Sequence, residues 1–523
     1  MMEKMNSMLQ LQQRSVWTKA LTLATLCGML GGCNVGPKYH APAPPTPPAF
    51  KESPAQFKET DGWKVAQPQD ATLRGKWWEI YSNPELNALE DQLNIDNQNI
   101  QEAFENFMEA RALVREARSQ YFPTVSIGPT FTESQTPSSF GASSGGGTTG
   151  GVTTSSSGSN SVVGRYSHPA DVSWEPDLWG KVRNTVHANQ YAAQLSAADL
   201  ENERLTEQAS LAQYYFEIRG QDVLQKILND TVEADKKSLD SVQAAYDTGV
   251  GDQISVVEAQ TTLASAESAA INIGVARAQY EHAIAMLVGK QASSFSIPVK
   301  PMTTAPPPIP VGLPSQLLER RPDIAAAERN MAAANAQIDV AHAAYYPALT
   351  LSASGGVESS SIENLLNWSS RFWSVGPLVS ETIYDGGLRR ATVNQYIATY
   401  NAHLAAYRQT VLTAFQQVED SLAAVRILSQ QIQRQQQAVN SSQTYLNLEV
   451  GRYETGIDPY VDVVIAQTTL LANQQTLTSL QVQEMTASVQ LIEALGGGWD
   501  RSQLPTPSQV TQKPSSSETT IQQ

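Results

Sequence analysis

The side chains that most often carry out chemistry are few in this 523-residue chain, and they form no catalytic pattern. The two cysteines, Cys27 and Cys33, both lie near the N-terminus, and the six histidines are scattered without a His-x-x-x-His pair. The Gly-x-Ser-x-Gly pattern occurs only inside a low-complexity Ser/Gly-rich tract (Gly141 to Gly145), not between a strand and a helix, and no phosphate-binding glycine loop is present. We therefore expect a protein that is not an enzyme and that has neither a catalytic residue nor a metal site.

Cys33 is the one residue for which the sequence predicts a covalent modification. Arg14 and Lys19 precede a short apolar run, Ala20 to Leu30, which has the composition of a signal peptide and is too short to span a bilayer. The run ends in Leu30-Gly31-Gly32-Cys33, which resembles a bacterial lipobox. The resemblance implies that Cys33 becomes the first mature residue and carries a covalent lipid, the only cofactor we expect. The alternative is an ordinary secretory signal in which this cysteine is incidental.

Composition limits the class of protein. The formal net charge of -16 argues against a nucleic-acid partner, which needs a basic footprint. Charged residues make up only 16% of the chain and hydrophobic residues 41%, which suits long helices that are exposed to solvent on more than one face. No stretch after the signal offers 18 consecutive apolar residues, so we expect no transmembrane helix and any membrane span must be made by strands.

The chain reads as a tandem repeat. Two motifs recur at an offset of 207 residues and a third at an offset of 224, so the first half carries a 17-residue insertion that includes much of the Ser/Gly-rich tract Ser138 to Ser161. The recurring motifs are Tyr246-Asp247-Thr248-Gly249 with Tyr453-Glu454-Thr455-Gly456, Ala259-Gln260-Thr261-Thr262-Leu263 with Ala466-Gln467-Thr468-Thr469-Leu470, and Tyr121-Phe122-Pro123 with Tyr345-Tyr346-Pro347.

The repeat and the proline-rich stretches predict six segments. They are a signal peptide (1–32), a lipid anchor with linker and N-terminal equatorial segment (33–83), a first repeat (84–302), a Pro-rich link (303–313), a second repeat (314–497) and a polar tail (498–523).

Each repeat predicts the same order of elements: helix, strand, loop, strand, long helix, tight turn, helix. The first helix should run from Pro84 to Gln120 and end before Pro123. Asp177 to Tyr246 lacks proline and is rich in helix formers, and Gly387 to Tyr453 mirrors it. A helix of this length is about 100 Å long, so these helices must lie side by side in a bundle or tube.

Between the helices the pattern alternates between apolar and polar residues, as in strands with one apolar face. Such strands, about 10 residues long, suit a membrane barrel, and the alternative is two soluble hairpins. Four strands cannot close a barrel, so a membrane role requires several chains to share one, and three chains with twelve strands leave room for a pore. The four segments are Val125 to Thr132, Tyr166 to Glu175, Leu349 to Ser354 and Trp373 to Ser380.

Several motifs together resemble the outer-membrane factors of the TolC/OprM type, the NodT-type outer-membrane lipoproteins of RND efflux systems. The resemblance implies a mainly α protomer with four strands in a shared twelve-stranded trimeric β-barrel, a long periplasmic α-helical barrel and an equatorial domain. Asn34 after Cys33 favours outer-membrane sorting in this family. The motifs are Cys33-Asn34-Val35-Gly36-Pro37-Lys38-Tyr39, Trp77-Trp78, Asn83-Pro84-Glu85-Leu86, Leu313-Pro314-Ser315, Arg320-Arg321-Pro322-Asp323-Ile324 and Tyr384-Asp385-Gly386-Gly387-Leu388-Arg389.

The resemblance also implies a docking site at two periplasmic helical turns. It places Gly249 and Gly456 at these turns, where a glycine with positive φ is suited to end a helix. Val250 and Ile457 beside them are then the expected contacts for a periplasmic adaptor, a membrane fusion protein. The alternative is a plain helix cap with no partner.

A gate is implied just past the second turn. Asp462 and Val461 match family positions that narrow the tunnel, whereas Ile465 stands where relatives often have a second aspartate. Three like carboxylates brought close repel one another, so a cation or a proton could hold such a ring shut. The alternative is that Asp462 is a solvated helix residue. At the junction of strands and helices, Asp171, Glu175 and Asp177 should face the lumen.

The predicted function is the outer-membrane exit channel of a tripartite efflux pump, in which a homotrimer works with an adaptor and an RND-type inner-membrane pump. It would sit in the outer membrane, be lipid-anchored and extend into the periplasm, and it would pass drugs, toxic compounds or metal ions. The alternative is a duct for type I protein secretion, because one fold serves both tasks. A trimeric coiled-coil adhesin predicts one sustained heptad register, and the strands that interrupt the helices twice argue against it.

Overall fold

The computed structural model describes residues 36–42, 47, 50–52, 75–135, 162–302, 305–309 and 317–513. They fall into two compact units. The sheet unit lies within Met1–Tyr39, Ala112–Asn189 and Ala333–Tyr400, and the helical unit lies within His40–Arg111, Gln190–Ala332 and Asn401–Gln523. Among the described residues, no helix combines the length and the apolar character needed to cross a membrane.

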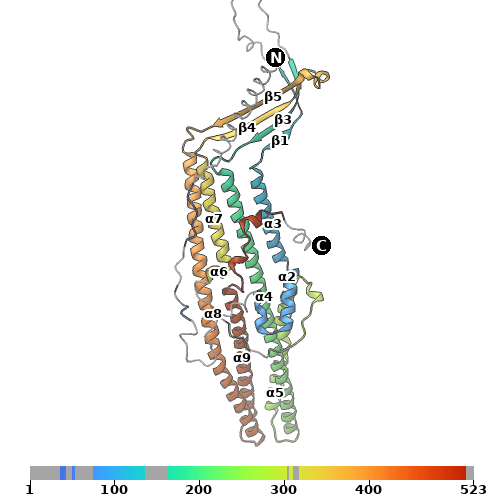
Figure 1. The fold of residues 1–523 in the computed structure, drawn as a ribbon. Helices are drawn as coiled ribbons and strands as arrows, with labels where there is room; N and C mark the ends of the chain where they lie inside the picture. The colour runs from blue at the N-terminus through green and yellow to red at the C-terminus, as the bar shows by residue number, and fades with distance from the viewer. Residues whose placement is uncertain are drawn as a thin grey trace, which may run out of the picture. The chain divides into compact units, whose positions relative to one another are not determined.

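The elements follow the predicted order in each half (Figure 1). The α-helices are α2 (Pro84–Asp96), α3 (Gln98–Ser119), α4 (Lys181–Asp247), α5 (Gln253–Leu287), α6 (Leu317–Arg320), α7 (Pro322–Ala343), α8 (Leu388–Glu454), α9 (Tyr460–Ala494) and α10 (Pro507–Thr511). The strands are β1 (Thr124–Ile127), β2 (Thr130–Gln135), β3 (Val162–Trp174), β4 (Ala348–Ser359) and β5 (Arg371–Ser380). The 3-10 helices are η2 (Trp77–Tyr81), η4 (Ala292–Ser294), η6 (Ile362–Asn364), η7 (Trp368–Ser370) and η8 (Arg501–Gln503).

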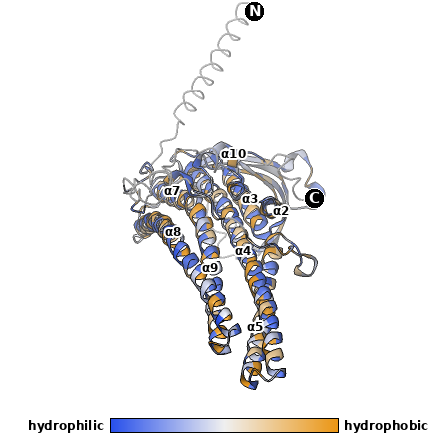
Figure 2. Ribbon diagram, turned by 90° about the horizontal axis from the view of Figure 1, so that it is seen from below, coloured by the Kyte–Doolittle hydropathy of each residue, from blue (hydrophilic) through white to orange (hydrophobic). Residues whose placement is uncertain are grey.

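The long helices confirm the duplication. α4 and α8 are each 67 residues long, and α5 and α9 are each 35 residues long. Their boundaries keep the offset of 207 residues, from Lys181 to Leu388 and from Gln253 to Tyr460. Hydrophobic (orange) and hydrophilic (blue) residues are interspersed along these helices in Figure 2, as expected for helices exposed to solvent on more than one face.

The first predicted helix, Pro84 to Gln120, is wrong as a single element because it breaks at Asn97. Asn97 adopts an extended backbone, and its Oδ1 accepts hydrogen bonds from the N–H groups of Asn99 (2.9 Å) and Ile100 (3.0 Å), so it caps α3. Its Nδ2 donates to Leu287 O (2.9 Å) and Glu207 Oε2 (3.2 Å). The break is therefore stabilised by contacts with distant helices.

The sheet confirms the alternation of the four predicted strand segments. It has the order β1-β3-β4-β5, every pair is antiparallel, and β2 also pairs with β3. The first segment is interrupted at Gly128 and Pro129, because proline has no N–H to donate, and it forms the two strands β1 and β2. The registers align an apolar row, Val125, Val172, Ala353 and Val375, and a polar row, Ser126, Asp171, Ser354 and Ser374.

The helical unit has its main core where η2, α2, α4, α5 and α9 pack, around Trp77, Leu86 and Tyr215. α9 approaches α4 closely at Gly220, where an added Cβ would lie 2.3 Å from Cγ2 of Val482. A second apolar cluster joins the ends of the α4/α5 and α8/α9 hairpins, and this packing fixes the two turns described next. Its buried members are Val242, Val256, Ala259, Tyr460 and Val463.

Candidate functional site

The two helical turns have the same backbone design. Gly249 has φ 77° and Gly456 has φ 74°, a conformation in which a side chain would be strained. Gly249 N–H donates to Tyr246 O and Val250 N–H to Ala245 O, both at 2.9 Å. The equivalent bonds follow Gly456 at the same lengths, so both helices end in a Schellman motif.

The residue after each glycine is apolar and exposed. Val250 is 86% exposed and Ile457 is 65% exposed. In many Schellman turns this residue packs back on its own helix, but here it faces outward. The structure thus places Gly249, Val250, Gly456 and Ile457 at the ends of two hairpins as accessible apolar tips. Their role in adaptor docking stays a prediction.

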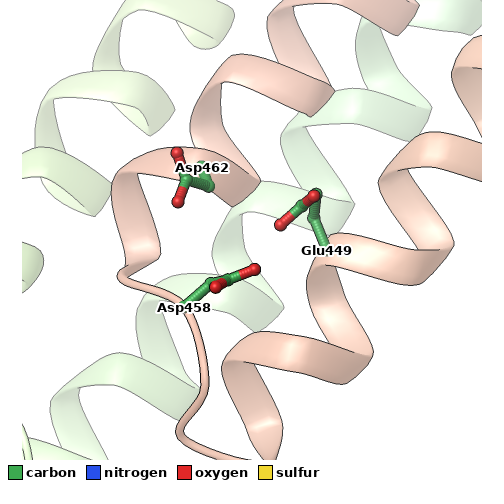
Figure 3. Close-up of side chains that lie close together, drawn as sticks. All are labelled: Glu449, Asp458 and Asp462. Atoms are coloured by element: carbon green, nitrogen blue, oxygen red, sulfur yellow. The ribbon is translucent and has the colours of Figure 1, made fainter.

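Three carboxylates gather at the second turn. Glu449 on α8, Asp458 in the turn and Asp462 in the first turn of α9 lie close together (Figure 3), each with a ligand oxygen within 4.8 Å of the others. In the described part of the chain they are the one group of three or more potential metal ligands that lie this close. Arg452 lies beside them and donates from Nη2 to Asp458 Oδ1 at 2.8 Å.

The charges within this cluster are unequal. The hydrogen bond from Arg452 holds the pKa of the Asp458 carboxyl below its usual value. The pKa of Glu449 is raised by desolvation and then by the charge and hydrogen bond of Asp458, with a further contribution from Asp462. One guanidinium therefore faces three acids, and the site concentrates negative charge at the end of one hairpin.

The acidic cluster has no equivalent in the first hairpin. At the 207-residue offset, Glu449, Asp458 and Asp462 correspond to Val242, Gly251 and Ser255. The sequence reasoning identified Asp462 alone and missed Glu449 and Asp458. Comparing the two repeats position by position would have found them, because a neutral residue becomes acidic at all three places.

Val461, Asp462 and Ile465 share the outer side of the start of α9. Val461 is 40% exposed and Ile465 is 51% exposed, whereas the intervening Val463 is buried in the cluster between the hairpins. The structure thus brings the three predicted gate residues together on one surface. Whether this surface lines a constriction stays a prediction.

The three predicted lumen acids differ in their surroundings. Asp171 is exposed on the polar face of β3, and the exposed Glu175 lies 3.3 Å from Lys181 Nζ. Asp177 accepts hydrogen bonds from the N–H groups of Val182 (3.0 Å) and Arg183 (2.9 Å). Asp177 therefore stabilises the start of α4, and the lumen-facing role of all three stays a prediction.

Cys33 lies outside the described residues, but the chain shortly after it is held in place. Asn335 Nδ2 on α7 donates to Pro37 O at 3.3 Å. Gly36 packs so closely on α7 that an added Cβ would lie 1.9 Å from Asp339 Oδ1. The segment that follows the predicted lipid anchor is thus fixed on α7.

Comparisons with known proteins agree with this arrangement. Residues 89–290 and 313–497 match the outer membrane efflux protein family. A solvent efflux pump outer membrane protein of Pseudomonas putida, SrpC, is 31% identical over 479 residues, which are 91% of this chain and 97% of SrpC. The solved outer-membrane channel OprN is similar with a TM-score of 0.78 and 26% identity over 89% of this chain and all of that one. The CmeC channel of Campylobacter jejuni shares the fold, with a TM-score of 0.79 at 21% identity over 91% of this chain and 97% of CmeC.

Proposed function

Because the chain belongs to the outer membrane efflux protein family, whose members are channel components of the outer membrane and not enzymes, we propose that it is the exit duct of a tripartite efflux pump. The duct passes small molecules from the periplasm to the outside. The observation that carries this proposal is the pair of helical turns with the same backbone design and apolar tips, one of which holds the acidic cluster.

A homotrimer is supported by the sheet. In the described part of the chain, β5 pairs with β4 alone, and β1 and β2 pair with β3 alone, so the sheet has two free edges. The apolar face of the sheet is exposed to solvent in the single chain: Val125 is 67%, Trp373 81% and Val375 74% exposed. In lipid an open edge leaves backbone groups unpaired, so copies of the chain must join edge to edge. Three copies then close a shared barrel of twelve strand positions.

The partners follow from the same surfaces. The tips at Val250 and Ile457 offer apolar contacts to a periplasmic adaptor, which connects the duct to an RND-type pump in the inner membrane. SrpC is named for solvent efflux, which supports small organic compounds as cargo here. A duct for type I protein secretion is the second candidate. The similarity to efflux proteins favours the efflux duct over it.

We propose that Asp462 is part of the gate. Replacing it with alanine removes the Asp462 carboxylate of every chain from the proposed ring, together with any cation or proton that the ring holds, so the constriction and its cation preference should both change. In planar bilayers, purified wild-type protein should give small, cation-preferring conductance steps, and Asp462→Ala should give steps several-fold larger. Ser255→Ala, at the equivalent place in the first hairpin, is the matched control and should behave as wild type.

The other outcomes are equally informative. Equal steps in wild type and Asp462→Ala would move the gate away from Asp462, toward Val461 and Ile465. If neither protein conducts although both are inserted, the duct itself is refuted.

We further propose that Cys33 carries the lipid that anchors the mature chain. Cys33→Ser should yield a protein without acyl mass and with signal residues still attached, as measured by intact mass spectrometry of the membrane fraction. Cys27→Ser lies within the predicted signal peptide and should leave the mature mass unchanged. A lipid on the Cys33→Ser protein would contradict the assignment.

A further inference from the structure

A buried carboxylate lies between the two hairpins, apart from the acidic cluster at the turn. Asp235 on α4 is only 2% exposed, and neither of its oxygens has a hydrogen-bond partner. The neighbouring Lys236 pairs with Glu233 and Glu267 instead. A carboxylate placed this way has lost its water without gaining a partner, which is costly when it is ionised.

The surroundings of Asp235 are polar but neutral. One turn along α4, Ser238 Oγ accepts a hydrogen bond from Gln467 Nε2 on α9 at 3.5 Å. The Oε1 atom of Gln467 is buried and has no partner. Tyr460, also on α9, is 3% exposed, and its hydroxyl is close enough to Ser238 for that side chain to influence its pKa. A protonated Asp235 has an O–H to donate to acceptors of this kind, whereas an ionised one does not.

The duplicated helix shows that this buried position does not require an acid. At the 207-residue offset from Asp235, α8 carries Ser442, which is also buried. Ser442 is fully satisfied: it donates to Ala438 O (2.8 Å) and accepts from Asn473 Nδ2 (2.6 Å). The first repeat therefore has an unpaired acid where the second has a neutral, hydrogen-bonded residue.

We propose that Asp235 is a proton-operated switch in the packing of the α4/α5 hairpin against the α8/α9 hairpin. With a proton on Asp235 the hairpins pack tightly near their ends. Without it, the buried charge drives a local separation that hydrates Asp235. That this separation of the hairpins alters channel opening rests on the proposed function. The packing change itself does not.

The direction of the pH effect follows from the electrostatics. Burial raises the pKa of Asp235 to about 6, so the packed state holds a proton that the hydrated state releases. Packing is thus strongest below the ordinary pKa of 3.8 and weakens as the pH rises from there to about 6, above which both states are ionised and the loss is complete. The titratable groups nearby on the other helices are Tyr460 of α9, Tyr453 of α8 and Glu258 of α5. The charges of Asp235, Tyr453 and Glu258 all raise the pKa of Tyr460. No basic side chain of the described residues pairs with Asp235.

Hydrogen exchange of the full-length purified protein tests the switch. After correction for intrinsic exchange, peptides of the hairpin ends in wild type should be less protected at about pH 8 than at about pH 5, by about tenfold in the opening equilibrium. Asp235→Asn keeps the shape without the charge and should be protected at both pH values. Asp230→Asn, an exposed aspartate on the same helix, should follow wild type.

Two results would overturn the switch: equal protection of the wild type at both pH values, or an unchanged pH dependence in Asp235→Asn. If Asp235→Asn does not fold, Asp235→Ser supplies the side chain that the second repeat uses, and the same criteria apply. Bilayer conductance of the same proteins is the second measurement. Absence of conductance in all of them, with the exchange result intact, would refute the proposed duct and still support the switch.

Discussion

Asp222→Ala is expected to destabilise the helical unit by about 3–5 kcal/mol, because it leaves the buried Arg219 and the half-buried Arg277 without their shared partner. The Asp222 side chain is fully buried. Its Oδ2 accepts from Arg219 Nη1 (2.9 Å) and from Lys300 N–H (2.8 Å), and its Oδ1 accepts from Arg277 Nε (2.8 Å). One carboxylate thus connects α4, α5 and the chain that follows α5.

The rest of the network makes the loss hard to repair. Arg219 also bonds Glu85 Oε2 (2.7 Å) and Pro298 O (2.7 Å), and Arg277 bonds Ile297 O (2.8 Å). Without Asp222 the two cations lose the carboxylate that lies between them and keep only Glu85 and Glu281 as ion-pair partners among the described residues.

Thermal unfolding of purified protein checks this expectation. Asp222→Ala should lower the midpoint by several degrees or prevent folding, and Asp222→Asn should fall between it and wild type. Asp240→Ala, at an exposed position of the same helix, is the control and should match wild type. A wild-type midpoint for Asp222→Ala would mean that the network contributes little.

The second large effect is expected at the tips. Val250→Asp combined with Ile457→Asp should abolish adaptor docking, because each change puts an unpaired charge into an apolar contact. Interface residues of this kind contribute about 2 kcal/mol each, so affinity should fall about 30-fold per tip. In the native host lacking its own copy, minimum inhibitory concentrations for a panel of antibiotics and solvents should drop to those of the deletion strain.

The control for this experiment is Ile95→Asp, which changes an isoleucine that is 76% exposed on α2 and not at a tip. It should retain resistance. The double variant should still reach the outer membrane and conduct in bilayers, which separates lost docking from misfolding. Full resistance in the double variant would refute the docking role of these turns.

The fold was predictable where the signal is local or repeated. The matching motifs around Gly249 and Gly456 predicted two equivalent hairpins, and the fold of TolC-like outer-membrane channels is confirmed for the single chain. The alternation around Val125 and Val375 predicted a sheet with one apolar face, because strand periodicity is a property of the sequence itself.

Other features depend on contacts that no local pattern encodes. The break at Asn97 has neither proline nor glycine and is set by bonds to Glu207 and Leu287. Glu449 and Asp458 approach Asp462 only once the second turn has formed. The burial of Asp235 depends on the packing of two hairpins far apart in sequence. Asp177 is the reverse case, since its capping contacts lie within six residues and could have been predicted.

The unlike charges of the two turns, which share one backbone design, have an evolutionary consequence. Duplication supplies two copies of one backbone, so acidic residues can accumulate at Glu449, Asp458 and Asp462 while Val242, Gly251 and Ser255 remain neutral. Selection can then change the charge of the second turn without changing the first. Divergence between the repeats thus lets the two turns evolve separately from one ancestral hairpin.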